Sequence, residues 1–196
     1  MALELLQSLV WTEYRLAILF TVIIPLGLLA WAVLQKAHAI THLLTIYWRV
    51  ASLLAITVYL MVAQIPLSFG VGFLALLLIP ISLWFWVDLN EEIDDRRGYL
   101  KLALTAWRWA TTLFCLLAAA LQVPYLRCAL STAEMATPTC QAWLEPTYLF
   151  WETFHSGARV GRMSFLALLA LVIYGLYLLY FLIFRLSKQG RSATGF

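Results

Sequence analysis

Charged residues are scarce in this sequence. Asp, Glu, Lys and Arg make up 12% of its 196 residues, about half the share in an ordinary soluble domain, whereas apolar and aromatic residues make up 64%. A water-soluble fold of this length cannot cover so much apolar surface. The composition therefore excludes a disordered chain, a nucleic-acid-binding module, a disulfide-rich miniprotein and an ordinary soluble enzyme. It indicates that lipid surrounds most of the chain.

The sequence also lacks the motifs that usually carry catalysis. It contains no Walker-type phosphate loop, no Gly-x-Ser-x-Gly, no Cys-x-x-Cys and no paired acid and base. The three cysteines, Cys115, Cys128 and Cys140, fit no metal-binding spacing. No acidic residue interrupts the middle of an apolar run, as is usual in a proton or ion pump. The sequence therefore leaves catalysis open but favours a binding function, and it predicts no metal site.

Apolar runs predict an all-α integral membrane protein with about five transmembrane helices in one membrane domain, residues 1–196. A bilayer core about 30 Å thick requires about 20 apolar helical residues. The uncharged run between Arg49 and Asp88 is long enough for two crossings, and the Pro66–Gly72 stretch marks a turn within it. We predict spans over residues 16–34, 45–64, 70–87, 102–121 and 163–184. The N-terminus has no basic leader, so we expect the first span to be retained.

An odd number of spans places the two termini on opposite sides of the membrane. One side carries Lys36, Arg96, Arg97, Lys101, Arg185, Lys188 and Arg191, whereas the other carries Arg15, Arg127, Arg159 and Arg162. Because the side richer in Lys and Arg faces the cytoplasm, we expect an external N-terminus and a cytoplasmic C-terminus. Loop 88–101 is then cytoplasmic, and loop 123–162 is external.

Short patterns recur between the first and second pairs of spans. Residues 24–31 and 79–86 both begin with Ile-Pro and end with Trp, and Trp48-Arg49 recurs as Trp107-Arg108. Two parallel helical hairpins with a fifth helix appended would explain the recurrence, as in some transporters. Chance recurrence in a biased composition is the alternative.

Arg49 and Arg108 are the most informative charges, because an arginine inside a span must be paired, hydrated or extended toward the headgroups. Each can bind an anionic lipid headgroup or pair with an acid of the 88–95 loop, where Asp88 is the nearest partner. That acidic loop can also bind Mg²⁺ or Ca²⁺ through carboxylate oxygens. A solvated loop with internal ion pairs is the alternative.

Three histidines are candidate ligands for a pigment or a metal. His38 and His42 lie four residues apart, so they share a face if the segment is helical. Neutral imidazoles can ligate a metal ion or the magnesium of a chlorophyll. No third ligand accompanies them, and His155 has no recognisable partner. The sequence requires no cofactor but leaves chlorophyll or carotenoid binding open.

The external loop and the last span are rich in aromatic residues. Residues 145–154 resemble a helix lying on the membrane surface, which a protein partner can equally cover. Tyr174, Tyr177 and Phe181 form a stripe on the last span, typical of lipid-facing or packed surfaces. Together with Trp143 and Trp151 they are candidate partner contacts. A disulfide between Cys128 and Cys140 is allowed if the compartment is oxidising, and two free thiols are the alternative.

Three stretches, residues 9–17, 46–52 and 81–92, resemble an uncharacterised family of cyanobacterial membrane proteins. The likeness covers most of the first 110 residues. It implies a cyanobacterial, thylakoid setting and an accessory role around photosynthetic complexes, such as photosystem assembly. If so, the external loop faces the thylakoid lumen.

We therefore expect a small, non-catalytic accessory or assembly factor that contacts membrane lipids and binds subunits of a photosynthetic complex. Two alternatives come from other classes. The first is a small homo-oligomeric transporter, suggested by the recurring patterns. The second is a membrane enzyme acting on lipid or isoprenoid substrates through the 88–95 acids and an arginine.

Overall fold

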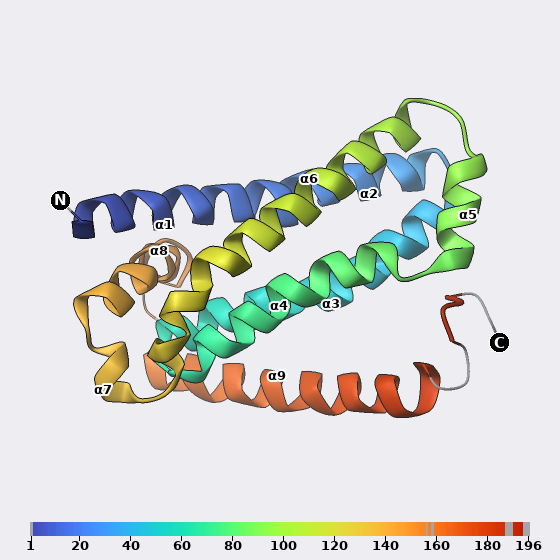
Figure 1. Cartoon of the computed structure of the whole chain (residues 1–196). Coiled ribbons are helices and arrows are strands. Elements are labelled where there is room, and N and C mark those ends of the chain that lie inside the picture. Colours follow the sequence, from blue (N-terminus) through green and yellow to red (C-terminus); the bar gives the residue numbers. More distant parts are fainter. Residues whose placement is uncertain (1, 156, 158, 187–189, 194–196) are drawn as a thin grey trace.

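The computed structural model describes residues 2–155, 157, 159–186 and 190–193, and every element in them is helical (Figure 1). Lys188, one of the charges predicted to be cytoplasmic, lies outside these residues. Within them, five helical stretches are long and apolar enough to cross a membrane. They are Leu3–Leu34, His38–Val62, Leu67–Trp84, Tyr99–Ala129 and Val160–Leu186. The prediction of an all-α integral membrane protein with five spans is confirmed.

The long helices share one general direction, and the chain ends lie at opposite ends of the molecule (Figure 1). The first span is built from α1 (Ala2–Ile18), a π-helical segment (Leu19–Ile23) and α2 (Ile24–Leu34). The others are α3 (His38–Val62), α4 (Leu67–Trp84), α6 (Tyr99–Gln122) and α9 (Val160–Tyr180). Most helices extend beyond the predicted spans because a helix continues after its apolar run ends. Leu3–Leu34 is 32 residues long, well beyond the ~20 needed for one crossing.

The predicted turn between the second and third spans is present. α3 ends at Val62, α4 begins at Leu67, and Gln64 between them has φ 53°. Pro66 lacks a backbone N–H and directly precedes the first residue of α4, where no intrahelical donor is needed. The long uncharged run is therefore two antiparallel helices.

The segment expected to be an acidic loop instead forms a helix, α5 (Val87–Asp95), across one end of the molecule (Figure 1). Leu89 and Ile93 are each 1% exposed, whereas Glu91, Glu92 and Asp94 face solvent. An apolar pair at i and i+4 with acids on the other face is the pattern of an amphipathic helix. Gly98, at φ 120°, then allows the chain to turn into α6.

The first span, α3 and α6 are joined by hydrogen bonds to a distorted stretch of helix. Pro25 has no N–H, so the carbonyl of Thr21 lacks its usual donor and instead accepts from the Tyr47 hydroxyl at 2.7 Å. The N–H of Ile24 bonds back to Leu19, which leaves the Phe20 carbonyl to accept from the Trp107 indole at 2.8 Å. The two donors satisfy carbonyls that would otherwise be unpaired in an apolar surrounding.

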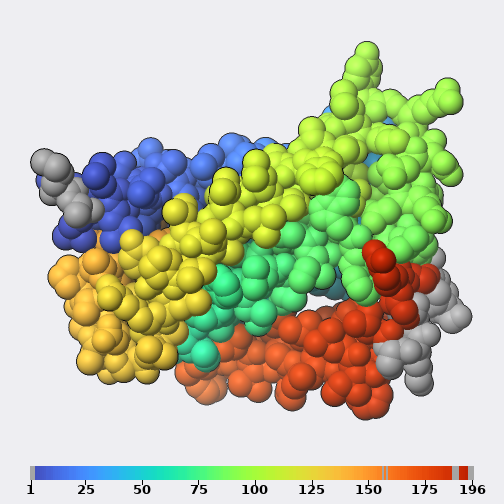
Figure 2. Space-filling view, viewed as in Figure 1, coloured from blue at the N-terminus to red at the C-terminus, as the bar shows by residue number. Residues whose placement is uncertain are grey.

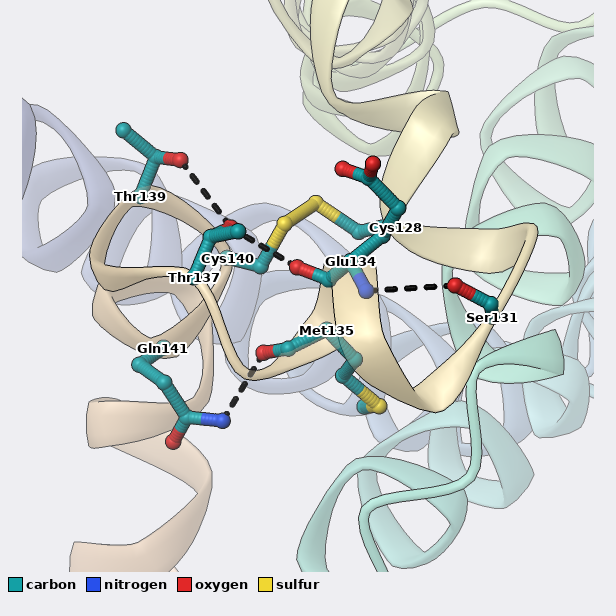
Figure 3. The surroundings of a disulfide bond; sticks show 8 residues. All are labelled: Cys128, Ser131, Glu134, Met135, Thr137, Thr139, Cys140 and Gln141. Carbon is teal, nitrogen blue, oxygen red and sulfur yellow. Dashed lines mark hydrogen bonds between the residues drawn. A yellow bond between two sulfur atoms is a disulfide. The ribbon is translucent and has the colours of Figure 1, made fainter.

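The other end of the molecule is closed by a cap made of a 3₁₀ segment (Val123–Ala129), α7 (Thr132–Met135) and α8 (Pro138–Phe154). α8 is seen end-on in Figure 1, so it runs across the long helices. A disulfide joins Cys128 to Cys140 (Figure 3). Both cysteines are buried beside Met135, Trp143 and Leu144. The cap therefore has a small core of its own.

Candidate functional site

A cavity of about 200 Å³ lies between α3, α4 and α9, and the surface is hollowed between α4 and α9 (Figure 2). Most of its wall is apolar, with Ile46 from α3, Leu78 from α4 and Leu178 from α9. α9 packs directly against α3, and the cavity lies between α9 and α4.

The polar part of the cavity wall is cationic. Arg49 from α3 and Arg185, near the end of the last span, both line it, and His42 lies two helical turns before Arg49. The described residues that line the cavity include no Asp or Glu. Both arginines are exposed, and neither side chain has an ion pair or hydrogen bond within the described part of the chain. The arrangement suits an anion, since two like charges near an apolar wall repel each other.

Aromatic side chains fill much of the remaining wall. Tyr174, Tyr177 and Phe181, the stripe predicted as a partner contact, all line the cavity, and Tyr177 is also 45% exposed at the surface. Phe181 packs edge-on against Trp86, with ring centroids 6.0 Å apart. Trp86 is 6% exposed, and its indole N–H has no acceptor among the described residues.

A second, shallower groove of about 490 Å³ follows the α3–α9 contact. It shares Arg49, Tyr174 and Tyr177 with the cavity, and Ile56 and Ile173 add apolar wall. The two spaces therefore meet at one arginine and two tyrosines.

Arg108, the other predicted arginine, has a structural role. It is 3% exposed and donates to the Leu83 carbonyl at 2.6 Å and to Asn90 Oδ1 at 2.7 Å. Its guanidinium also lies 3.9 Å from the centre of the Trp84 ring. The structure thus gives Arg108 a neutral partner, Asn90, in place of the predicted Asp88. Arg108 ties α4, α5 and α6 together, whereas Arg49, its counterpart in the recurring pattern, opens onto the cavity.

Asp88 instead holds the C-terminal tail. Its carboxylate accepts hydrogen bonds from the Ala193 N–H at 2.9 Å and the Ser192 hydroxyl at 3.0 Å. Arg191 donates to the Phe85 carbonyl at 3.0 Å and accepts from the Val87 N–H through its own carbonyl. Ala193 lines the cavity. The tail therefore closes one end of the cavity, at the corner between α4 and α5.

The three histidines are not brought together. His38 and His42 lie on the first turns of α3 and are exposed, and only His42 lines the cavity. His155 lies at the end of α8, where its Nε2 is 3.3 Å from the Tyr59 hydroxyl and its ring packs on Phe150. Among the described residues, no three His, Cys, Asp or Glu side chains converge on a point that could hold a metal.

The remaining predicted residues belong to the cap. Cys128 and Cys140 are bonded, with Cα atoms 5.9 Å apart, whereas Cys115 is free and buried in α6. Trp143 is 9% exposed and packs on Tyr125, so most of its ring lies within the chain. Trp151 is half-buried.

Sequence reasoning missed two sets of residues. Arg185 was predicted only as one of the cytoplasmic charges, although its spacing of one helical turn from Phe181 puts both residues on one face. No local pattern predicted a hydrogen-bonding role for Tyr47 and Trp107. The signal for them was Pro25 within an apolar run, because a proline inside a membrane helix leaves a carbonyl that a neighbour must satisfy.

The chain was compared with known proteins. None of the curated proteins and none of the solved structures matches it. Residues 7–194 match the model of a family described as a protein of unknown function (DUF3177). Because this match covers nearly the whole chain, the protein belongs to that family.

Proposed function

We propose that this protein is a small, non-catalytic accessory or assembly factor that binds helices of a larger membrane complex. The observation that carries the proposal is the isolation of the last span. Only 6% of its most apolar stretch is buried within the chain, compared with 22% to 50% for the other four spans. The face of α9 that points away from α3 therefore has no neighbour within the described part of the chain and is free to contact another protein.

The polar groups once considered for catalysis support a binding role. Arg108 and Asn90 bond each other inside the bundle, and Asp88 holds the tail. Glu91, Glu92 and Asp94 lie on the solvent face of α5. Of the residues needed by the alternative of a lipid or isoprenoid enzyme, Arg108 and Asp88 thus hold the fold and the other acids of α5 are spread over a surface, so that Arg49 alone faces the cavity.

For the setting, we propose the cyanobacterial thylakoid, with a photosystem as the partner complex. The likeness of residues 9–17, 46–52 and 81–92 to cyanobacterial membrane proteins supports this setting. The distribution of Lys and Arg supports a lumenal N-terminus and a cytoplasmic C-terminus. The disulfide-bonded cap then faces the lumen, an oxidising side on which such a bond persists.

Photocrosslinking in native membranes tests the proposal. Leu176 and Leu179 on α9 are 63% and 55% exposed and line neither the cavity nor the groove. A photoreactive phenylalanine at either position is expected to give a discrete adduct with a photosystem subunit. Matched controls are Leu113 and Leu117 on α6, which are 60% and 57% exposed.

The proposal requires that α9 and α6 give different crosslinked products. Protein adducts from α9 and lipid adducts alone from α6 support docking through the last span. If both helices give lipid adducts alone, α9 is simply a lipid-facing span and the accessory role is wrong.

A further inference from the structure

We propose that the cavity between α3, α4 and α9 is a binding site for an anionic membrane lipid, with the headgroup at Arg49 and Arg185 and a hydrocarbon chain along the α3–α9 groove. This inference is independent of the accessory role, because it concerns the inner side of α9, whereas docking concerns the outer side. It rests on charge, on an unused donor and on the shape of the apolar surface.

Charge identifies the headgroup. Arg49 and Arg185 come from distant parts of the sequence and line the same small space, with no acid among its described lining residues. Two guanidinium groups that line one otherwise apolar space attract an anion to it. Phosphate, sulfonate and carboxylate groups accept the paired N–H bonds that arginine offers.

A buried donor gives a second, independent indication of a ligand. Trp86 lines the cavity and is 6% exposed. Of the four buried indole N–H groups that have no acceptor within the described residues, it is the one at the cavity. Buried N–H groups are almost always paired, since an unpaired one costs about 1–3 kcal/mol. A headgroup oxygen would supply the missing acceptor.

The volumes of the cavity and the groove indicate which part of the lipid each one holds. A cavity of about 200 Å³ is smaller than the ~300–1,000 Å³ of pockets that hold drug-sized ligands, so it suits a headgroup better than a whole lipid. The adjoining groove of about 490 Å³ shares Arg49, Tyr174 and Tyr177 and continues past Ile56 and Ile173. A chain leaving the headgroup at Arg49 therefore meets a continuous apolar path between α3 and α9.

Lipid titration monitored by native mass spectrometry tests the site. The full-length protein is stripped of lipid in detergent and titrated with dioleoyl phosphatidylglycerol, with dioleoyl phosphatidylcholine and with sn-glycerol 3-phosphate. The first two share their chains and differ in net charge, and the third carries the anion without chains. We expect phosphatidylglycerol to bind at least about tenfold more tightly than either of the others.

Matched variants locate the binding. Arg49→Gln combined with Arg185→Gln is expected to abolish the preference for phosphatidylglycerol, and Arg49→Lys combined with Arg185→Lys to retain most of it. Arg162→Gln, at the opposite end of α9, is the control and should bind as the native chain does. All three positions are exposed, so these variants are expected to fold.

Three results would overturn the proposal. Equal affinity for the two lipids would show that charge is not recognised. An unchanged preference in the double glutamine variant would place the binding elsewhere. Glycerol phosphate binding as tightly as phosphatidylglycerol would show a site for a free anion, with no part played by the groove.

Discussion

At the scale of single residues, two side chains donate hydrogen bonds to backbone carbonyls that are left without a donor near Pro25. Pro25 removes a donor, the preceding π-helical segment frees a second carbonyl, and Tyr47 and Trp107 supply the two missing hydrogen bonds. Both donors are buried, at 0% and 4% exposure. The role of Tyr47 and Trp107 depends on the distorted helix around Pro25 in the first span. The residues that flank them in the sequence therefore do not indicate this role.

Tyr47→Phe is expected to destabilise the protein by about 1 kcal/mol, because the Thr21 carbonyl loses its donor. In a Pro25→Ala background residue 25 regains an N–H that can bond Thr21, so the same change should cost less than half as much. Thermal unfolding of the four chains in one detergent measures this coupling. Equal costs in the two backgrounds would show that the hydrogen bond does not compensate for the proline.

Arg108 is the second residue whose loss should be costly. Arg108→Met removes the donor to Leu83 and Asn90 and leaves both oxygens unpaired, at about 1–3 kcal/mol for each. The unfolding temperature of Arg108→Met should lie below that of the native chain. In the Arg108→Met background, Asn90→Ala should cost only the hydrogen bond from the Asn90 amide to the Trp84 carbonyl, and therefore less than in the native chain. Arg97→Gln, an exposed change nearby, is the control. If Arg108→Met unfolded at the same temperature as Arg97→Gln, Arg108 would not hold α4, α5 and α6 together.

At the scale of helices, α3 and α4 make the most extensive contact among the described helices. A Cβ atom on Gly72 would lie 3.0 Å from Thr57 Cγ2 and 3.5 Å from the Gln122 amide, whereas a Cβ on Gly70 would meet nothing within 4 Å. The glycine at position 72 thus sets the distance between the two helices. Small residues have this role at many helix interfaces in membranes.

Gly72→Ala is therefore expected to lower stability by about 1–3 kcal/mol, the usual cost of overpacking. Gly70→Ala, on the same helix, should have little effect. Chemical unfolding in mixed micelles compares the two variants. If Gly70→Ala proved the more damaging, the α3–α4 packing described above would be wrong.

The helices also show which parts of the structure could be predicted from the sequence and which could not. The five spans were predictable because apolar length alone distinguishes a chain in lipid from a chain in water. α5 was missed because its acids indicated a loop, although Leu89 and Ile93 carried a helical period. The cavity could not be predicted, since it depends on how α9 lies against α3, and no local pattern in either helix fixes that arrangement.

At the scale of the whole molecule, the two ends of the helical bundle are covered by different elements. One end holds α5 and the C-terminal tail around the cationic cavity. The other is the cap, where the disulfide closes a loop between residues 12 apart and Ser131 accepts a hydrogen bond from the Glu134 N–H at the start of α7 (Figure 3). The cap core includes residues of α1, α3 and α4, so the cap packs against these three helices at this end of the molecule.

Cys128→Ala combined with Cys140→Ala is expected to cost about 3 kcal/mol, the value for a closed loop of similar length. Treatment of the native protein with dithiothreitol should lower its unfolding temperature to that of this variant. The variant itself should not respond to the reductant. An equal response of both proteins would mean that the cap does not depend on the bond.

The central claim is that this small membrane protein works as part of a larger complex. The most direct measurement is purification from native membranes through a C-terminal tag in mild detergent, with the mass, subunits and absorption spectrum of the eluted particle. The account predicts photosystem subunits in fixed proportion to the tagged chain. A colourless particle containing only copies of this chain would contradict it.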